Sequence, residues 1–114
     1  MEDVIEINIK SLNQTVSLAL AEFLVELDRA KFSGVKVIKV ITGYGSHGKG
    51  GEIKRELQNL LYKLKKENKI TNYYKGETLK QEDIQNLGKI SPKLILDNEL
   101  SGYNSGVTIV TLSN

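Results

Sequence analysis

The stretch "ITGYGSHGKGGEIKREL" (residues 41–57) gathers residue types that suit the binding of a phosphate group. Its five glycines accept positive φ and let the backbone approach another group closely. A strand pattern precedes the glycines and a helical pattern follows them, so loop N–H groups and a helix N-terminus can face one anion. The predicted phosphate-binding residues are Gly43, Tyr44, Gly45, Ser46, His47, Gly48, Lys49, Gly50 and Gly51, with Lys54 and Arg55 on the helix.

Two side chains of this loop could do more than bind. Lys49 adds a full positive charge, and His47 is the only histidine of the chain. An imidazole either donates to a phosphate or acts as a general acid or base near neutral pH. The alternative is that His47 is simply a solvated loop residue.

The loop also comes close to a Walker A motif. Gly43 to Lys49 matches the first seven positions of G-x-x-x-x-G-K-[ST], but Gly50 stands where the Mg²⁺-binding hydroxyl belongs. A nucleotide hydrolase is therefore not favoured.

Positive charge is concentrated around this loop. The formal charge is −3 over residues 1–35, +7 over residues 36–75 and −2 over residues 76–114. The middle third is where an anionic partner would bind, although a solvated lysine-rich helix would have the same composition.

The remaining composition is that of an ordinary globular chain. The 114 residues are 39% apolar and 26% charged, without cysteine, which predicts one domain with its own core and no disulfide framework. No apolar run is long enough to cross a bilayer. We expect a cytoplasmic, monomeric protein without a metal site or cofactor.

Periodicity predicts the elements that position the loop. Alternation and β-branched residues predict strands at 4–10, 35–41, 69–75 and 106–112. Apolar stripes predict two core-facing helices, on Val16, Leu20, Phe23, Leu24 and Leu27 and on Ile53, Leu57, Leu60, Leu61 and Leu64. Asn13 or Thr15 is the expected cap of the first helix and Gly34 its stop. "TLKQEDIQNL" predicts a short third helix capped by Thr78. The order is that of an α/β protein with a mostly parallel or mixed sheet.

The segment "VKVIKVITGYGSHGKGGEIKRELQNLL" (35–61) resembles the second strand, glycine loop and second helix of the Smr (small MutS-related) domain. "GYNSGVTIVTL" (102–112) is similar to the closing segment of that family, and "INIKSLNQTVSLALAEFL" (7–24) occupies the place of its "LDLHG" motif and first helix. The resemblance covers residues 1–114 as a single Smr-like domain. It implies a two-layer α/β sandwich of β-α-β-α-β-β order, like the C-terminal domain of translation initiation factor three.

The resemblance also implies nucleic-acid binding and, in several members, endonuclease activity, in some cases on ribosome-associated messenger RNA. This sequence departs from the family where the chemistry is expected. Asn8 stands at the Asp of "LDLHG", Lys10 at its His, and Thr42 at the His that opens the glycine loop. An amide binds metal or accepts a proton less well than a carboxylate does.

Three functional hypotheses follow. The first is a domain that binds RNA or DNA backbone phosphate, with weak or absent nuclease activity and with Tyr44 and Tyr103 as stacking rings. The second is an active RNA or DNA endonuclease that uses His47, with Lys10 as a second catalytic candidate. The third is a module for a small phosphorylated ligand or a protein partner.

Overall fold

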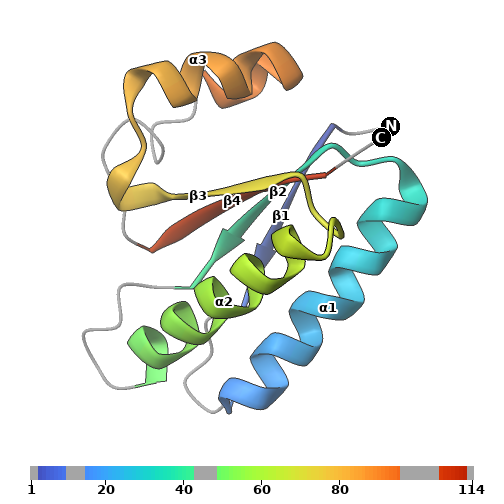
Figure 1. The fold of residues 1–114 in the computed structure, drawn as a ribbon, viewed down its shortest axis with the longest axis vertical. Coiled ribbons are helices and arrows are strands. Elements are labelled where there is room, and N and C mark those ends of the chain that lie inside the picture. Colours follow the sequence, from blue (N-terminus) through green and yellow to red (C-terminus); the bar gives the residue numbers. More distant parts are fainter. Residues whose placement is uncertain (1–2, 10–14, 43–48, 96–105, 113–114) are drawn as a thin grey trace.

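The computed structural model describes residues 3–9, 15–42, 49–95 and 106–112 (Figure 1). Along the chain it contains β1 (Val4–Asn8), α1 (Val16–Ser33), β2 (Val37–Ile41), α2 (Lys49–Lys66), β3 (Asn72–Lys75), the 3₁₀ turn η1 (Gly76–Thr78), α3 (Gln81–Ile90), the 3₁₀ turn η2 (Pro92–Leu94) and β4 (Val107–Thr111). The expected β-α-β-α-β-β order is confirmed, with α3 placed before the last strand.

The four strands form one mixed sheet in the order β1-β2-β4-β3. β1 and β2 are parallel, whereas β4 runs antiparallel to both β2 and β3. The last strand of the chain therefore lies inside the sheet, and β3 forms one of its edges. The expectation of a mixed sheet is confirmed, but the sheet is not mostly parallel, because two of its three strand pairs are antiparallel.

Helices α1 and α2 lie side by side on one face of this sheet (Figure 1). Successive strand residues point to opposite faces, so Ile38 and Val40 of β2 and Val110 of β4 meet these helices. The core on this side consists of Ile7, Ile9, Ala19, Phe23, Leu27, Ala30, Val35, Ile38, Val40, Ile53, Leu57, Leu61, Leu64, Ile70, Val110 and Leu112. The sheet with α1 and α2 is thus a two-layer α/β sandwich, as the sequence predicts.

The opposite face of the sheet is covered in part by α3 and the turns beside it (Figure 1). A second core forms there from Val37, Leu79, Ile84, Leu87, Leu94, Val107 and Ile109. Because both faces are covered, every residue of β4 is buried.

Helix α1 begins and ends where the sequence predicts. The Thr15 hydroxyl oxygen accepts a hydrogen bond from the Leu18 N–H at 3.2 Å, which identifies Thr15 as the N-cap. Gly34 follows the helix with φ of 78°, a left-handed conformation that glycine adopts without steric cost. The predicted stripe is less accurate, because Leu24 is 38% exposed and Ala19 and Ala30 are buried instead.

The third helix begins later than predicted. Its N-cap is Lys80, whose backbone N–H donates to the Asp83 carboxylate at 3.0 Å. Thr78 instead ends η1, where its hydroxyl donates to the Lys75 carbonyl oxygen at 3.3 Å. The prediction of Thr78 as the cap is therefore wrong, since this hydroxyl closes the turn after β3.

The buried stripe of α2 is expected to carry much of the stability. Leu57→Ala should lower the free energy of unfolding by about 2–5 kcal/mol, because the residue is fully buried in the core beneath α2. Leu18→Ala on α1 is the matched control; Leu18 is 61% exposed, and the change should cost below about 0.5 kcal/mol. Urea denaturation measures both, and equal losses would contradict the assignment of α2 to the core.

Candidate functional site

Most of the predicted glycine loop falls outside the described residues. Gly43, Tyr44, Gly45, Ser46, His47 and Gly48 lie there, as does Lys10. Lys49 and Gly50 form the start of α2, and Gly51, Lys54 and Arg55 follow in its first two turns. The predicted order of strand, glycine stretch and helix is confirmed on both sides of the loop.

The described residues that flank this loop meet at one end of the strands β1, β2 and β4, where β1 and β2 finish and β4 begins. Ile9, which precedes Lys10, donates its N–H to the Ile41 carbonyl oxygen at 2.9 Å. Thr42, which precedes the loop, donates its N–H to the Gly106 carbonyl oxygen at 2.9 Å. Ile9, Thr42 and Gly106, which are next in the chain to residues 10–14, 43–48 and 96–105, thus lie together at this end of the strands.

The first cations of α2 differ in how freely they could meet a ligand. Lys54 is largely buried and its Nζ pairs with Glu77 Oε2 of η1. The other oxygen of that carboxylate is buried with no partner among the described residues. Arg55 is 68% exposed and is paired with its neighbour Glu56 at 3.8 Å. Lys54 therefore carries a structural ion pair, whereas Arg55 is accessible to solvent.

One flank of α2 carries polar side chains along much of its length. Lys54, Gln58 and Lys65 recur at spacings of four and seven residues, which places them on one side of an α-helix. This side adjoins the edge strand β3, because Lys54 reaches η1 and the Lys65 Nζ donates to Asn72 Oδ1 at 3.0 Å.

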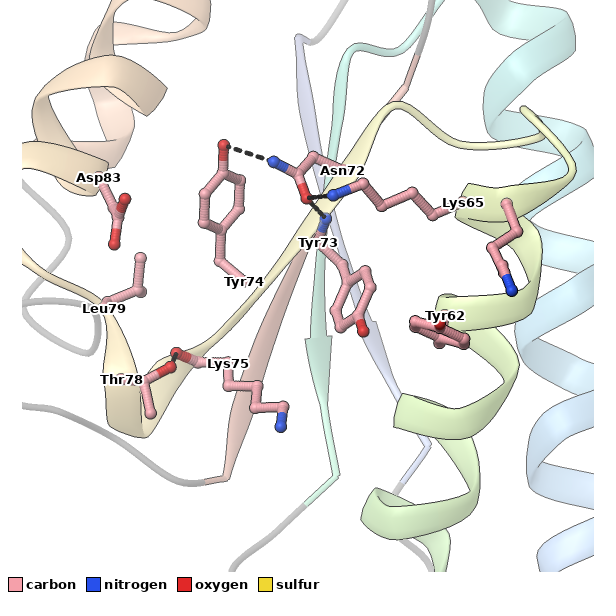
Figure 2. A pocket seen from close by; sticks show the side chains of 10 residues that line it. Tyr62, Lys65, Asn72, Tyr73, Tyr74, Lys75, Thr78, Leu79 and Asp83 are labelled. Atoms are coloured by element: carbon pink, nitrogen blue, oxygen red, sulfur yellow. Dashed lines mark hydrogen bonds between the residues drawn. The ribbon is translucent and has the colours of Figure 1, made fainter.

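Between this flank and β3 lies a groove of about 590 Å³, the β3 groove (Figure 2). Its lining residues come from α2, β3, η1 and the start of α3: Tyr62, Lys65, Lys66, Asn72, Tyr73, Tyr74, Lys75, Thr78, Leu79 and Asp83. Figure 2 shows Tyr73 on the side of β3 that faces α2, and Tyr74 on the side that faces α3. The groove therefore follows the open edge of the sheet.

Asn72 organises this edge. Its Oδ1 accepts hydrogen bonds from the Lys65 Nζ at 3.0 Å and from the Tyr73 backbone N–H at 2.8 Å. Its Nδ2 donates to the Tyr74 hydroxyl at 3.3 Å (Figure 2). One amide thus holds α2, the edge backbone and an aromatic ring in a fixed arrangement.

The charges that line the groove are mainly positive. Lys65, Lys66 and Lys75 face it against the single carboxylate of Asp83. Asp83 is occupied in capping α3, and no carboxylate of the described chain pairs with any of the three lysines. The α2 side of the groove would therefore attract an anionic ligand electrostatically.

Two aromatic rings accompany these cations. Tyr62 is 56% exposed, and the Lys66 Nζ lies 5.2 Å from the centroid of its ring, a cation–π arrangement. Tyr73 is half-buried and packs against the core under α2. Cations beside accessible rings are the chemistry by which proteins hold unpaired nucleotides.

The sequence reasoning missed these tyrosines. The predicted stacking rings are Tyr44 and Tyr103, and both lie outside the described residues. The signal was present in "LYKLKK" and "NYYK", where tyrosines stand next to lysines. Their convergence depends on β3 being the edge strand beside α2.

Within the described ranges, no group of three or more His, Cys, Asp or Glu side chains could hold a metal ion. In the same residues no helix is long and apolar enough to cross a membrane. Comparison of the chain with protein-family models, curated proteins and solved structures found no significant match. The Smr resemblance therefore stays a hypothesis that rests on the sequence motifs.

Asn72→Ala should destabilise the protein by about 1–2 kcal/mol, because the Tyr73 N–H and the Tyr74 hydroxyl each lose a partner. Asn59→Ala is the control, since Asn59 is exposed and makes only a long contact of 3.5 Å with Glu56. Thermal or urea unfolding measures the difference. If both variants unfold alike, Asn72 does not organise the edge.

Proposed function

We propose that this is an Smr-like domain that binds nucleic acid through its phosphate backbone, with weak or absent nuclease activity. The observation that carries the proposal is the flank of α2. The helix starts at the end of the glycine stretch and leads from there to the three lysines of the β3 groove. This flank offers separate points of attachment for a chain of phosphates.

The start of α2 supports a phosphate at its N-terminus. The first four N–H groups of a helix have no partner within it and carry a partial positive charge. Here they follow directly on the glycine-rich residues 43–48. Ile9, next to Lys10, and Gly106, which follows residues 101–105, lie at the same end of the strands as the start of the glycine loop.

The length of α2 favours a polymer over a small ligand. At 1.5 Å rise per residue, Lys65 lies about 24 Å along the helix axis from Lys49. One strand of B-form nucleic acid advances 3.4 Å per nucleotide, so this distance corresponds to about seven nucleotides. A mononucleotide or a sugar phosphate would reach one end of the flank only.

The residue at the end of β1 is the reason for proposing weak or absent nuclease activity. Asn8 lies opposite Ile41, in the last residue pair of β1 and β2 before the glycine loop. The Smr resemblance expects a carboxylate at this position, and an amide is a poorer metal ligand and proton acceptor. Binding residues are thus retained beside a position that has lost its acid.

The test is a titration of labelled single-stranded RNA and of a DNA duplex at several salt concentrations. With about three to five phosphate contacts, log K should fall with log salt at a slope of about −3 to −4. The double variant Lys49→Ala, His47→Ala should bind more weakly and with a shallower slope. A gel of the same samples should show intact nucleic acid.

Any of three results would contradict the proposal. A flat salt response of the wild type would exclude backbone phosphate as the main ligand. Cleavage that the double variant loses would show an active endonuclease in which His47 takes part. Stabilisation by a mononucleotide without binding of any polymer would favour the small-ligand alternative.

Releasing Lys54 from its ion pair should strengthen binding. Glu77→Gln removes the charge that Lys54 pairs with, so we expect tighter binding and a salt slope steeper by up to about one. Glu26→Gln is the matched control, because it removes the same charge from the pair with Arg29 on α1. If the two variants change the slope equally, Lys54 does not contact phosphate.

A further inference from the structure

The β3 groove contains an accessible ring that the core does not need. Tyr62 lies on α2 outside the stripe of buried leucines and more than half of its surface is exposed, at 56%. Lys66 stands over its ring and leaves the remaining exposed surface for another partner. Tyr73 lines the same groove from the neighbouring strand (Figure 2).

A peptide strand is the first alternative occupant, because β3 is an edge strand and open edges recruit further strands. The hydrogen-bonding groups of this edge are already used in part. The Tyr73 N–H donates to the side chain of Asn72, and the Lys75 carbonyl oxygen accepts from the Thr78 hydroxyl. Side chains thus occupy two of the backbone groups of β3 with which an added strand would pair.

The charges that line the groove also limit which ligand can occupy it. Three lysines against one carboxylate favour an anion, and Asp83 on the α3 side directs that anion toward α2. The rings favour a ligand with flat apolar faces. An anionic polymer with a planar group on every unit is a nucleic acid whose bases are exposed.

We propose that the β3 groove binds a single-stranded segment of nucleic acid, with an unpaired base stacked on Tyr62 and adjacent phosphates on Lys65, Lys66 and Lys75. This inference rests on the proposed function and adds the strandedness of its ligand. The bases of a duplex are stacked on one another and cannot reach a ring on a helix surface. The start of α2, by contrast, would contact only phosphate and could therefore bind single-stranded or duplex nucleic acid.

The experiment compares a labelled single strand with a duplex of the same sequence by fluorescence anisotropy, with the whole 114-residue chain. Tyr62→Ala should weaken binding of the single strand about tenfold or more. Its affinity for the duplex should stay within about twofold, because no base stacks on this ring in that complex. Tyr62→Phe should keep the affinity for the single strand, since the ring remains.

Two controls make the result specific. Phe32→Ala removes a ring that is 94% exposed on α1, and should change neither affinity. The melting temperature of each variant confirms that the exposed substitutions leave the fold intact. Tyrosine fluorescence gives a second readout, because the chain has five tyrosines and no tryptophan. The single strand should quench the wild type more than Tyr62→Phe.

The possible failures are distinct. If the wild type binds neither form, the proposed function and this inference fall together. If it binds both forms equally and Tyr62→Ala changes neither, the inference is wrong while the proposed function stands. If polyglutamate competes as strongly as the single strand, the groove selects charge alone and an acidic peptide is the better occupant.

Discussion

The burial of both faces of the central strands is the constraint on which the rest of the structure depends. β4 contributes Val107 and Ile109 to one core and Val110 to the other. A strand with two apolar faces is stable only when a layer covers each side. Helices α1 and α2 supply one layer, and α3 with its flanking turns supplies the other (Figure 1).

This constraint also creates the edge at which the candidate site lies. Because β4 occupies the interior position beside β2, the short strand β3 is left with one neighbour. Its alternate residues then divide between the layers, with Tyr73 toward α2 and Tyr74 toward α3. The open edge is fitted with lysines and with side chains that use its backbone groups, which is how edge strands avoid pairing with other chains.

One side of helix α2 packs in the core, and the neighbouring side lines the candidate site. Ile53, Leu57, Leu61 and Leu64 anchor it to the sheet, and the neighbouring side carries Lys54, Tyr62 and Lys65. The core side consists of buried apolar residues, whereas the flank consists of charged and aromatic residues. Lys54 shows that composition alone does not assign a role, because its charge serves Glu77 within the protein. Lys65, in contrast, is held by a neutral amide, which leaves its charge without a counter-charge among the described residues.

Local patterns determined a large part of this protein. The alternation in "VIEINIK", the stripe from Ile53 to Leu64, the Thr15 cap and the left-handed Gly34 are all readable within one or two turns of chain, because each depends on neighbours in sequence. The same holds for the basic character of residues 36–75 and for the glycine stretch before a helix. The start of α3 was misplaced because Thr78 and Lys80 offer competing local caps, and the turn after β3 decided between them.

Tertiary structure alone decided which residues share a site. The order β1-β2-β4-β3 depends on pairing between strands far apart in the chain, as between Tyr74 and Ile109, and no local pattern encodes such a partner. That order brings Tyr62 and Tyr73 to one groove, joins Lys54 to Glu77, and gathers Ile9, Thr42 and Gly106 at one end of the strands. The physical reason is that burial selects among strand arrangements by the apolar area that the whole sheet hides, a quantity that belongs to the assembled layers and to no single segment.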